Sequence, residues 1–134
     1  MKIAIVGSRN YPNKEQVLAY VRLITQKYPE AEFVSGGAMG VDTWAADELR
    51  RLQCPVHVER AKWEEYANHS RRGKKNPAGM IRNKVMAEMV DLIVAFWDGK
   101  SPGTLGMMKI ALELGKPVYL CTPQSEMMRW EGVA

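Results

Sequence analysis

Cysteine, histidine and long apolar runs are all scarce in this sequence of 134 residues. Cys54 and Cys121 lie far apart without the spacing of metal ligands, so we interpret them as small hydrophobic core residues. His57 and His69 have no second ligand at a suitable spacing, so no metal site is expected, and no partner is predicted for His57. No apolar run reaches about 18 residues, and residues 1–6 are too short for a signal peptide. We therefore predict no membrane association and a cytoplasmic protein.

Two common nucleotide-binding fingerprints are also missing. No Gly-x-Gly-x-x-Gly follows the first apolar run, and no glycine-rich loop ends in Gly-Lys-Ser or Gly-Lys-Thr. These absences argue against NAD binding and ATP hydrolysis, and we predict no bound cofactor. The net charge of +4 is compatible with an anionic ligand, nucleic acid included, but it is also common in mildly basic soluble domains that bind no nucleic acid.

The sequence does contain a regular alternation of strand and helix patterns. Apolar runs predict five strands at residues 2–6, 32–35, 55–59, 91–97 and 117–121, and the four intervening stretches carry helical patterns. This alternation predicts one α/β domain over residues 1–134, with a doubly wound, mostly parallel, five-stranded sheet of Rossmann-like type and helices on both faces. Residues 122–134 show no period and are interpreted as a C-terminal tail.

One segment, residues 60–79, breaks the rhythm and predicts a long polar loop. Its centre carries Arg71, Arg72, Lys74 and Lys75. A solvated loop is one interpretation of this cluster. Binding of single-stranded nucleic acid, with Trp63 and Tyr66 as stacking groups, is the other.

Three strand-to-helix loops combine glycine with hydroxyl side chains: residues 7–9, 35–40 and 98–104. In a parallel sheet these loops lie at one edge, where ligands of doubly wound sheets bind. Glycine permits close approach of the backbone, and free N–H groups at a helix start attract phosphate. We therefore predict that the turn 35–40 is part of a site for a phosphate-bearing ligand; tight turns without a ligand are the alternative.

Three side chains beside these loops are candidate ligand contacts. Arg82, near the start of a helix opened by Gly79, could hold a phosphate or carboxylate with two hydrogen bonds, or it could face solvent. Asp42 and Asp98 could accept ribose hydroxyls or activate water. Their alternatives are a helix N-terminal carboxylate for Asp42 and an Asp-Gly turn for Asp98.

Four motifs in order resemble the YspA/cpYpsA-related branch of the SLOG superfamily. They are Gly7-Ser8-Arg9, Ser35-Gly36-Gly37-Ala38-x-Gly40-Val41-Asp42, Ala78-Gly79-x-Ile81-Arg82-Asn83 and Ala95-Phe96-Trp97-Asp98-Gly99-x-Ser101-x-Gly103-Thr104. Trp63 and Tyr66 also fit, and the resemblance runs from residue 3 to about residue 120. It implies a Rossmann-like domain that binds a nucleoside phosphate or an ADP-ribose derivative and, by analogy, a homo-oligomer.

The predicted ligand-binding residues are those of the four motifs. They are Gly7, Ser8, Arg9, Ser35, Gly36, Gly37, Ala38, Gly40, Val41, Asp42, Arg82, Asn83, Trp97, Asp98, Gly99, Ser101, Gly103 and Thr104.

One position departs from the enzymes of the wider superfamily, which also includes the DNA-processing protein DprA. LOG-type phosphoribohydrolases and nucleoside-monophosphate N-glycosidases carry a catalytic glutamate where this sequence has Met107. A thioether can neither act as that nucleophile nor stabilise an oxocarbenium-like centre. We therefore predict nucleotide binding that is sensor-like or weakly catalytic, with Arg82 and Asp98 as the candidate catalytic residues. Cleavage of the base–ribose bond of nucleoside monophosphates and binding of single-stranded nucleic acid are the alternatives.

Overall fold

The computed structural model describes residues 1–71, 73 and 75–132. Its strands are β1 (Lys2–Gly7), β2 (Glu32–Ser35), β3 (Val56–Val58), β4 (Leu92–Phe96), β5 (Val118–Cys121) and β6 (Met128–Arg129). Its helices are α1 (Lys14–Lys27), α2 (Val41–Arg51), α3 (Ala67–Arg71), α4 (Ala78–Met89) and α5 (Pro102–Glu113), with a 3₁₀ turn η1 (Trp63–Tyr66).

The strands form one sheet in the order β3-β2-β1-β4-β5-β6. The first five strands are parallel, and β6 pairs antiparallel with β5. The predicted doubly wound, mostly parallel α/β sheet is therefore confirmed. The predicted number of five strands was wrong, because β6 lies in the segment interpreted as a tail.

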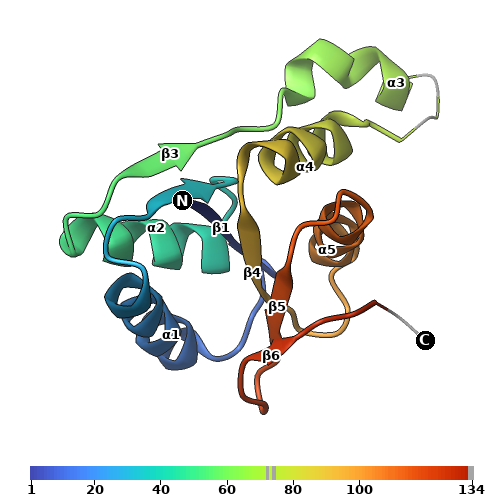
Figure 1. Ribbon diagram of the computed structural model, residues 1–134. Helices are drawn as coiled ribbons and strands as arrows, with labels where there is room; N and C mark the ends of the chain where they lie inside the picture. Colours follow the sequence, from blue (N-terminus) through green and yellow to red (C-terminus); the bar gives the residue numbers. More distant parts are fainter. Residues whose placement is uncertain (72, 74, 133–134) are drawn as a thin grey trace.

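The two faces of the sheet have separate cores. Helices α1 and α2 cover one face and α4 and α5 cover the other (Figure 1). Alternate residues of β4 serve the two cores: Val94 packs on the α1–α2 side, whereas Ile93 packs on the α4–α5 side. All five residues of β4 are buried, as expected for a strand covered on both faces.

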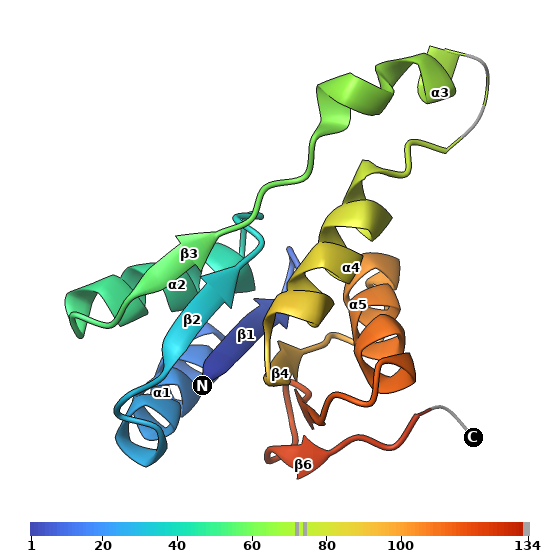
Figure 2. The same ribbon diagram turned by 45° about the horizontal axis from the view of Figure 1, so that its top comes forward.

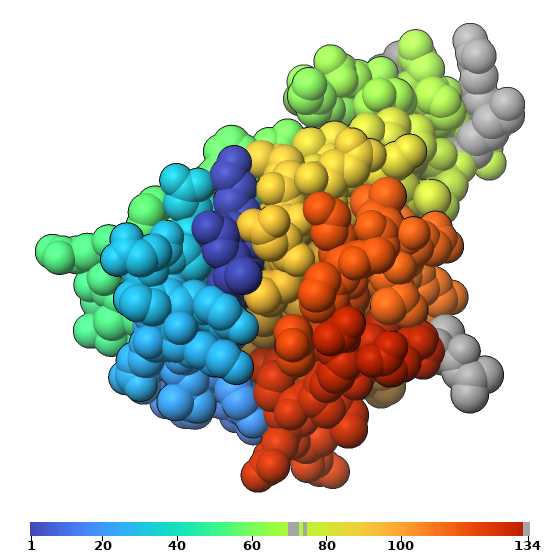
Figure 3. All heavy atoms as spheres, viewed as in Figure 1, coloured from blue at the N-terminus to red at the C-terminus, as the bar shows by residue number. Residues whose placement is uncertain are grey.

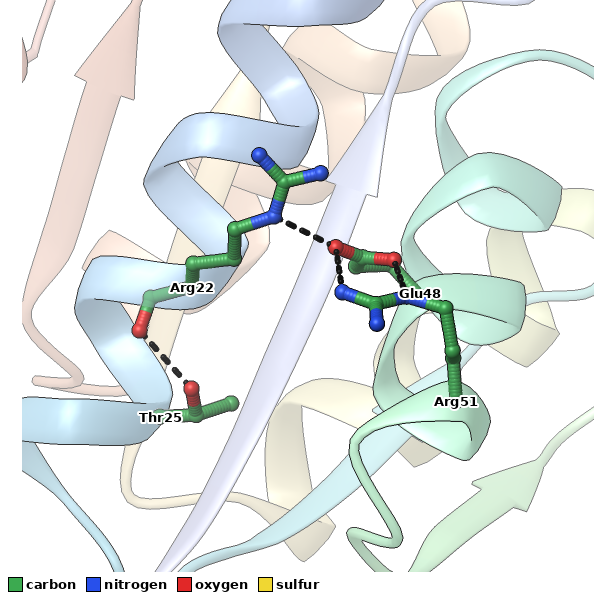
Figure 4. A network of polar contacts seen from close by, with 4 residues as sticks. All are labelled: Arg22, Thr25, Glu48 and Arg51. Atoms are coloured by element: carbon green, nitrogen blue, oxygen red, sulfur yellow. Dashed lines mark hydrogen bonds and ion pairs between the residues drawn. The ribbon is translucent and has the colours of Figure 1, made fainter.

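An ion-pair network joins α1 to α2 across the surface of their core (Figure 4). Glu48 of α2 accepts hydrogen bonds from Nε of Arg22 and from Nε of Arg51, both at 2.6 Å. The hydrogen bonds from Arg51 and Arg22 lower the pKa of Glu48 to about 2. This carboxylate therefore stays ionised, and its bond to Arg22 links α2 to α1.

The segment after β5 packs against the body of the protein. Trp130 is 9% exposed and lies in the core on the α4–α5 side. Its backbone N–H donates to the carbonyl of Val118 at 2.8 Å. Gln16 of α1 donates to the carbonyls of Thr122 and Ser125 at 2.9 and 3.1 Å. Figure 3 shows this segment, in red, beside α1 in light blue and α5 in orange.

The predicted long loop 60–79 contains η1 and α3, which extend from the body beyond the start of α4 (Figure 2). Each is about one turn long and carries no apolar period, which is why the sequence pattern missed them. Asn76 ties the two ends of the excursion together by donating to the carbonyl of Trp63 at 3.0 Å. Of the predicted basic cluster, Arg72, Lys74 and the side chain of Arg71 lie outside the described residues.

Candidate functional site

The loops after β1, β2 and β4 lie at the same edge of the sheet, because these strands are parallel neighbours. Figure 2 shows β1, β2 and β3 side by side, with their arrowheads toward the same edge. The chain leaves β1 through α1 on one face, whereas β4, on the other side of β1, continues into α5 on the opposite face. The β1–β4 boundary is therefore the topological switch point of the sheet, where ligands of such folds bind.

The turn 35–40, which we call the glycine turn, is held by Ser35 and Asp42. Oγ of Ser35 accepts the N–H of Gly37 at 3.2 Å and donates to the carbonyl of Asp42 at 3.4 Å. The carboxylate of Asp42 accepts the N–H of Ala38 at 3.3 Å and that of Gly7 at 3.2 Å. The N–H groups of Gly37 and Ala38 therefore serve the turn itself, and in this conformation they are not free to bind a phosphate.

Two of the predicted ligand-binding glycines are required by packing inside the protein. A Cβ at Gly7 would lie 2.5 Å from Cβ of Val41, at the start of α2. A Cβ at Gly40 would overlap the carbonyl oxygen of Arg9, and the φ of Gly40 is +83°. These glycines bring the loop after β1, the glycine turn and α2 into close contact.

Arg82 connects α4 to the glycine turn. Its Nη1 donates to the carbonyl of Gly36 at 2.6 Å, and its Nε donates to Oδ1 of Asn83 at 3.0 Å. Asn83 is 8% exposed and donates to the carbonyl of Gly103, at the start of α5, at 3.3 Å. The second, third and fourth motifs therefore meet in one hydrogen-bonded network, although they lie far apart in sequence.

The loop after β4 is ordered by Asp98. Its Oδ1 accepts the N–H groups of Lys100 and Ser101, both at 2.8 Å, and its own N–H donates to Oγ of Ser8 at 3.1 Å. Ser8 is 1% exposed, and this hydrogen bond joins the first motif to the fourth. Asp98 is a turn residue, as one interpretation expected, and it also lies at the rim of the cavity described below.

The start of α5 satisfies most of its own backbone groups. Oγ of Ser101 accepts the N–H of Thr104 at 3.4 Å, and the indole of Trp97 donates to the carbonyl of Ser101 at 3.0 Å. Pro102 has no N–H, so within the described part of the chain Gly103 has the one first-turn N–H without a partner. A Cβ at either Gly99 or Gly103 would meet no atom within 4 Å. This loop is therefore more open to a ligand than the glycine turn.

A hollow of about 570 Å³ opens between the loops that follow β1, β4 and β5. It is lined by Arg9, Asn10, Pro12, Asp98, Lys100, Ser101, Pro102 and Pro123. Its volume lies within the roughly 300–1,000 Å³ that small-molecule sites occupy. Of the predicted residues, Arg9, Asp98 and Ser101 line the hollow, which is thus centred on the switch point, whereas the glycine turn lies beside it.

Burial and hydrogen bonding set the charges around the site. Burial raises the pKa of Asp42 to about 6, against the opposing effects of the Ala38 N–H, the Arg82 charge and the Gly7 N–H. Burial lowers the pKa of the Arg82 guanidinium, although Asp42 and Glu59 act in the other direction. Burial would also raise the pKa of Asp98, but hydrogen bonds from the loop N–H groups outweigh it and lower that pKa. Asp98 is therefore a fixed anion, whereas Asp42 titrates near pH 6.

Met107, which the resemblance places where the enzymes carry a glutamate, is 1% exposed and packs in the core on the α4–α5 side. Its side chain does not line the hollow. Glu113 lies at the far end of α5 and does not take its place.

Sequence reasoning missed several residues at this edge. Two of them, Asn10 and Lys100, line the hollow. Asn10 directly follows the first motif and Lys100 is an unspecified position within the fourth, so counting every residue of these loops would have included both. Arg60 was missed because a single arginine after a strand carries no pattern. It lies against Gly37, where a Cβ would be 2.9 Å from its Nη1. The sequence also suggested no partner for His57, and in the structure its Nε2 lies 2.8 Å from Oε2 of Glu59.

The described part of the chain contains no group of three or more His, Cys, Asp or Glu side chains placed to hold a metal ion. None of its helices is both long enough and apolar enough to cross a membrane.

Comparison with known proteins shows similarity of fold. No protein-family model matches the sequence, and the curated proteins contain no significant match. Among solved structures, the chain is similar to DNA processing protein A (DprA) from Helicobacter pylori, which is described for its single-stranded DNA binding mode. The TM-score is 0.67 and the identity 21%, over 90% of this chain and 64% of that one. It is also similar to DprA from Streptococcus pneumoniae, with a TM-score of 0.69 and 20% identity over 89% of this chain and 49% of that one.

A third similar structure is TM1055, with a TM-score of 0.67 and 21% identity over 87% of this chain and 71% of that one. The chain thus spans less than two thirds of each DprA chain. These similarities show that it has the Rossmann-like fold found in DprA, which is the fold that the SLOG resemblance implied.

Proposed function

We propose that this protein binds a nucleotide-derived ligand, a nucleoside phosphate or an ADP-ribose derivative, in the hollow at the switch point, as the resemblance to the YspA-related SLOG branch implies. The observation that carries the proposal is the hollow itself. It combines two cations, Arg9 and Lys100, with the ionised Asp98 at the edge where such sheets bind ligands.

Each part of the hollow suits one part of a nucleotide. Asp98 is an ionised acceptor for ribose hydroxyls, and Ser101 adds a hydroxyl group beside it. Pro12, Pro102 and Pro123 supply apolar surface for a base. Arg9 favours a phosphate-bearing ligand and extends toward the glycine turn, where its Nη2 lies 3.5 Å from Sδ of Met39.

Binding without cleavage is the form of the function that the site supports best. Cleavage of a base–ribose bond needs a carboxylate beside the sugar, and Met107 is an apolar core residue at the position of the enzymes' glutamate. One carboxylate oxygen of Asp98 already accepts two loop N–H groups, so it is not free to act on a substrate. The test measures release of free base from nucleoside monophosphates by chromatography, for the wild-type protein and for Asp98→Ala. Base release by the wild-type protein that is absent in the variant would contradict this view.

The direct test is calorimetric titration with adenosine 5′-monophosphate and ADP-ribose. Arg9→Gln and Lys100→Gln should each weaken binding about 5- to 50-fold, since each removes one charge from the hollow. Lys109→Gln is the matched control, because Lys109 is an exposed residue of α5 that does not line the hollow. No binding by the wild-type protein at millimolar concentration, or equal losses in the control, would refute the proposal.

Single-stranded nucleic acid is a second candidate ligand, favoured by one observation. Trp63 is 55% exposed on η1, available for stacking on a base. The H. pylori DprA structure, which shares the fold, is described for its single-stranded DNA binding. Retention on single-stranded DNA that falls steeply with salt and is lost in Trp63→Ala would support it, whereas absence of retention at low salt would exclude it.

A further inference from the structure

Arg60 follows β3 at the same edge of the sheet, and its guanidinium lies over the glycine turn. A Cβ at Gly37 would lie 2.9 Å from Nη1 and 3.3 Å from Cζ of Arg60. Within the described part of the chain, Arg60 makes no hydrogen bond or ion pair. Its guanidinium therefore has five N–H donors and a full charge without a protein partner.

The neighbouring glycine carries a second guanidinium. A Cβ at Gly36 would lie 2.5 Å from Nη1 of Arg82. Arg82 spends two of its five donors on the Gly36 carbonyl and on Asn83, so the others remain for a ligand. Two arginines thus flank one dipeptide, Arg82 beside Gly36 and Arg60 beside Gly37.

Two carboxylates, Asp42 and Glu59, lie near Arg82 and favour its charged form. Asp42 accepts the N–H groups of Gly7 and Ala38, and Glu59 pairs with His57 at 2.8 Å. Among the described residues, neither carboxylate forms an ion pair with Arg60 or Arg82. Both carboxylates act on Arg82, so the guanidinium of Arg60 is the charge that remains for an anionic group.

We propose that Arg60 and Arg82 form an anion subsite over Gly36 and Gly37 that receives the 5′-phosphate of a nucleotide whose nucleoside part occupies the hollow. The inference rests on the proposed function and deepens it. The subsite lies at the β2–β3 boundary, two strand spacings from the hollow at the β1–β4 boundary, a separation of about 10 Å. A nucleoside 5′-monophosphate can span that separation, and Arg9, in the loop after β1, extends from the hollow toward the glycine turn.

The test compares adenosine 5′-monophosphate with adenosine on the same variants. Arg60→Gln removes the charge, and we expect it to weaken binding of the monophosphate about 10-fold or more while changing that of adenosine less than about 2-fold. Arg60→Lys keeps the charge but loses the planar pair of donors, so it should restore part of the affinity. Lys62→Gln, an exposed residue two positions later, is the control for loss of charge in this segment and should have little effect.

Three outcomes would overturn the subsite. The first is unchanged binding of the monophosphate by Arg60→Gln, which leaves the proposed function intact. The second is an equal loss of adenosine and monophosphate binding, which indicates general damage. The third is no binding of either compound by the wild-type protein, which overturns the subsite and the proposed function together. The melting temperature of Arg60→Gln should stay within about 3 °C of wild type, since Arg60 holds no described residue in place.

Discussion

Asp42 lies in the first turn of α2, yet Oδ1 of its carboxylate accepts the backbone N–H of Gly7 at the end of β1, at 3.2 Å. The other carboxylate oxygen accepts the N–H of Ala38 in the glycine turn. A side chain that is 4% exposed therefore joins the first two ligand loops. Burial without an ion pair makes its protonation depend on pH in the physiological range.

Asp42→Asn should change how stability depends on pH. Burial raises the pKa of Asp42 from 3.8 to about 6, so between these values the folded protein holds a proton that the unfolded chain has lost. The resulting stabilisation is present below about pH 4 and is lost as the pH rises through about 6. We expect the free energy of unfolding of Asp42→Asn, relative to wild type, to rise by roughly 3 kcal/mol from about pH 4 to about pH 7.5.

Urea unfolding of both proteins across that pH range gives this difference directly, and groups that titrate alike in the two proteins cancel. The asparagine also loses one acceptor toward Gly7 or Ala38, a cost that shifts the whole curve but does not depend on pH. A difference that stays flat with pH would mean that Asp42 titrates normally in the folded protein.

Gly40→Ala should destabilise the fold by about 2–4 kcal/mol. Gly40 has a φ of +83°, and an added Cβ would overlap the carbonyl oxygen of Arg9, so strain and a backbone clash act together. Gly106→Ala is the matched control, because it lies inside α5 with no atom within 4 Å of the added carbon. Thermal unfolding should show that this control gains about 0.5–1 kcal/mol, and equal effects at both positions would contradict the assignment.

Trp130→Ala should cost about 3–5 kcal/mol, because its side chain is 9% exposed and fills the core on the α4–α5 side. Met128→Ala, two residues earlier and 57% exposed, should change stability by less than about 0.5 kcal/mol. Denaturant unfolding of the two variants measures the contrast. Similar small effects would mean that the segment after β5 is only loosely attached.

Met107→Glu should destabilise the protein by several kcal/mol, because it places a carboxyl group in an apolar core. Met107→Leu should cost less than about 1.5 kcal/mol. Although the first variant restores the glutamate of the enzyme pattern, it should release no base from adenosine 5′-monophosphate. Measurable base release would instead mean that the side chain at this position can reach the hollow.

The parallel sheet was predictable because each of its five strands is an apolar run next to glycine, proline or a helix start. β4 is the clearest case, since burial on both faces requires a continuous apolar sequence. β6 was not predictable, because Met128 and Arg129 are exposed and owe their strand conformation to pairing with Leu120 and Tyr119. Short elements fixed by tertiary pairing leave no period in the sequence.

The gathering of the candidate loops at one edge of the sheet was predictable, but their internal connections were not. Glycine-rich loops after parallel strands predicted the edge at which the hollow lies, and the helix-start motif indicated Arg82. The bond from Arg82 to the carbonyl of Gly36 joins residues 46 positions apart, and no local pattern encodes it. The positions of Arg60 and Pro123 likewise follow from strand order, which local motifs do not determine.

The pairing of β1 on both of its sides has a consequence for synthesis of the chain. Ile3 pairs with Phe33 on one side and with Leu92 on the other. At about 5–20 residues per second, the ribosome needs roughly 3–12 s to extend the chain from the first partner to the second. During that interval one edge of the central strand has no neighbour, so the nascent protein is most exposed to mispairing before β4 emerges.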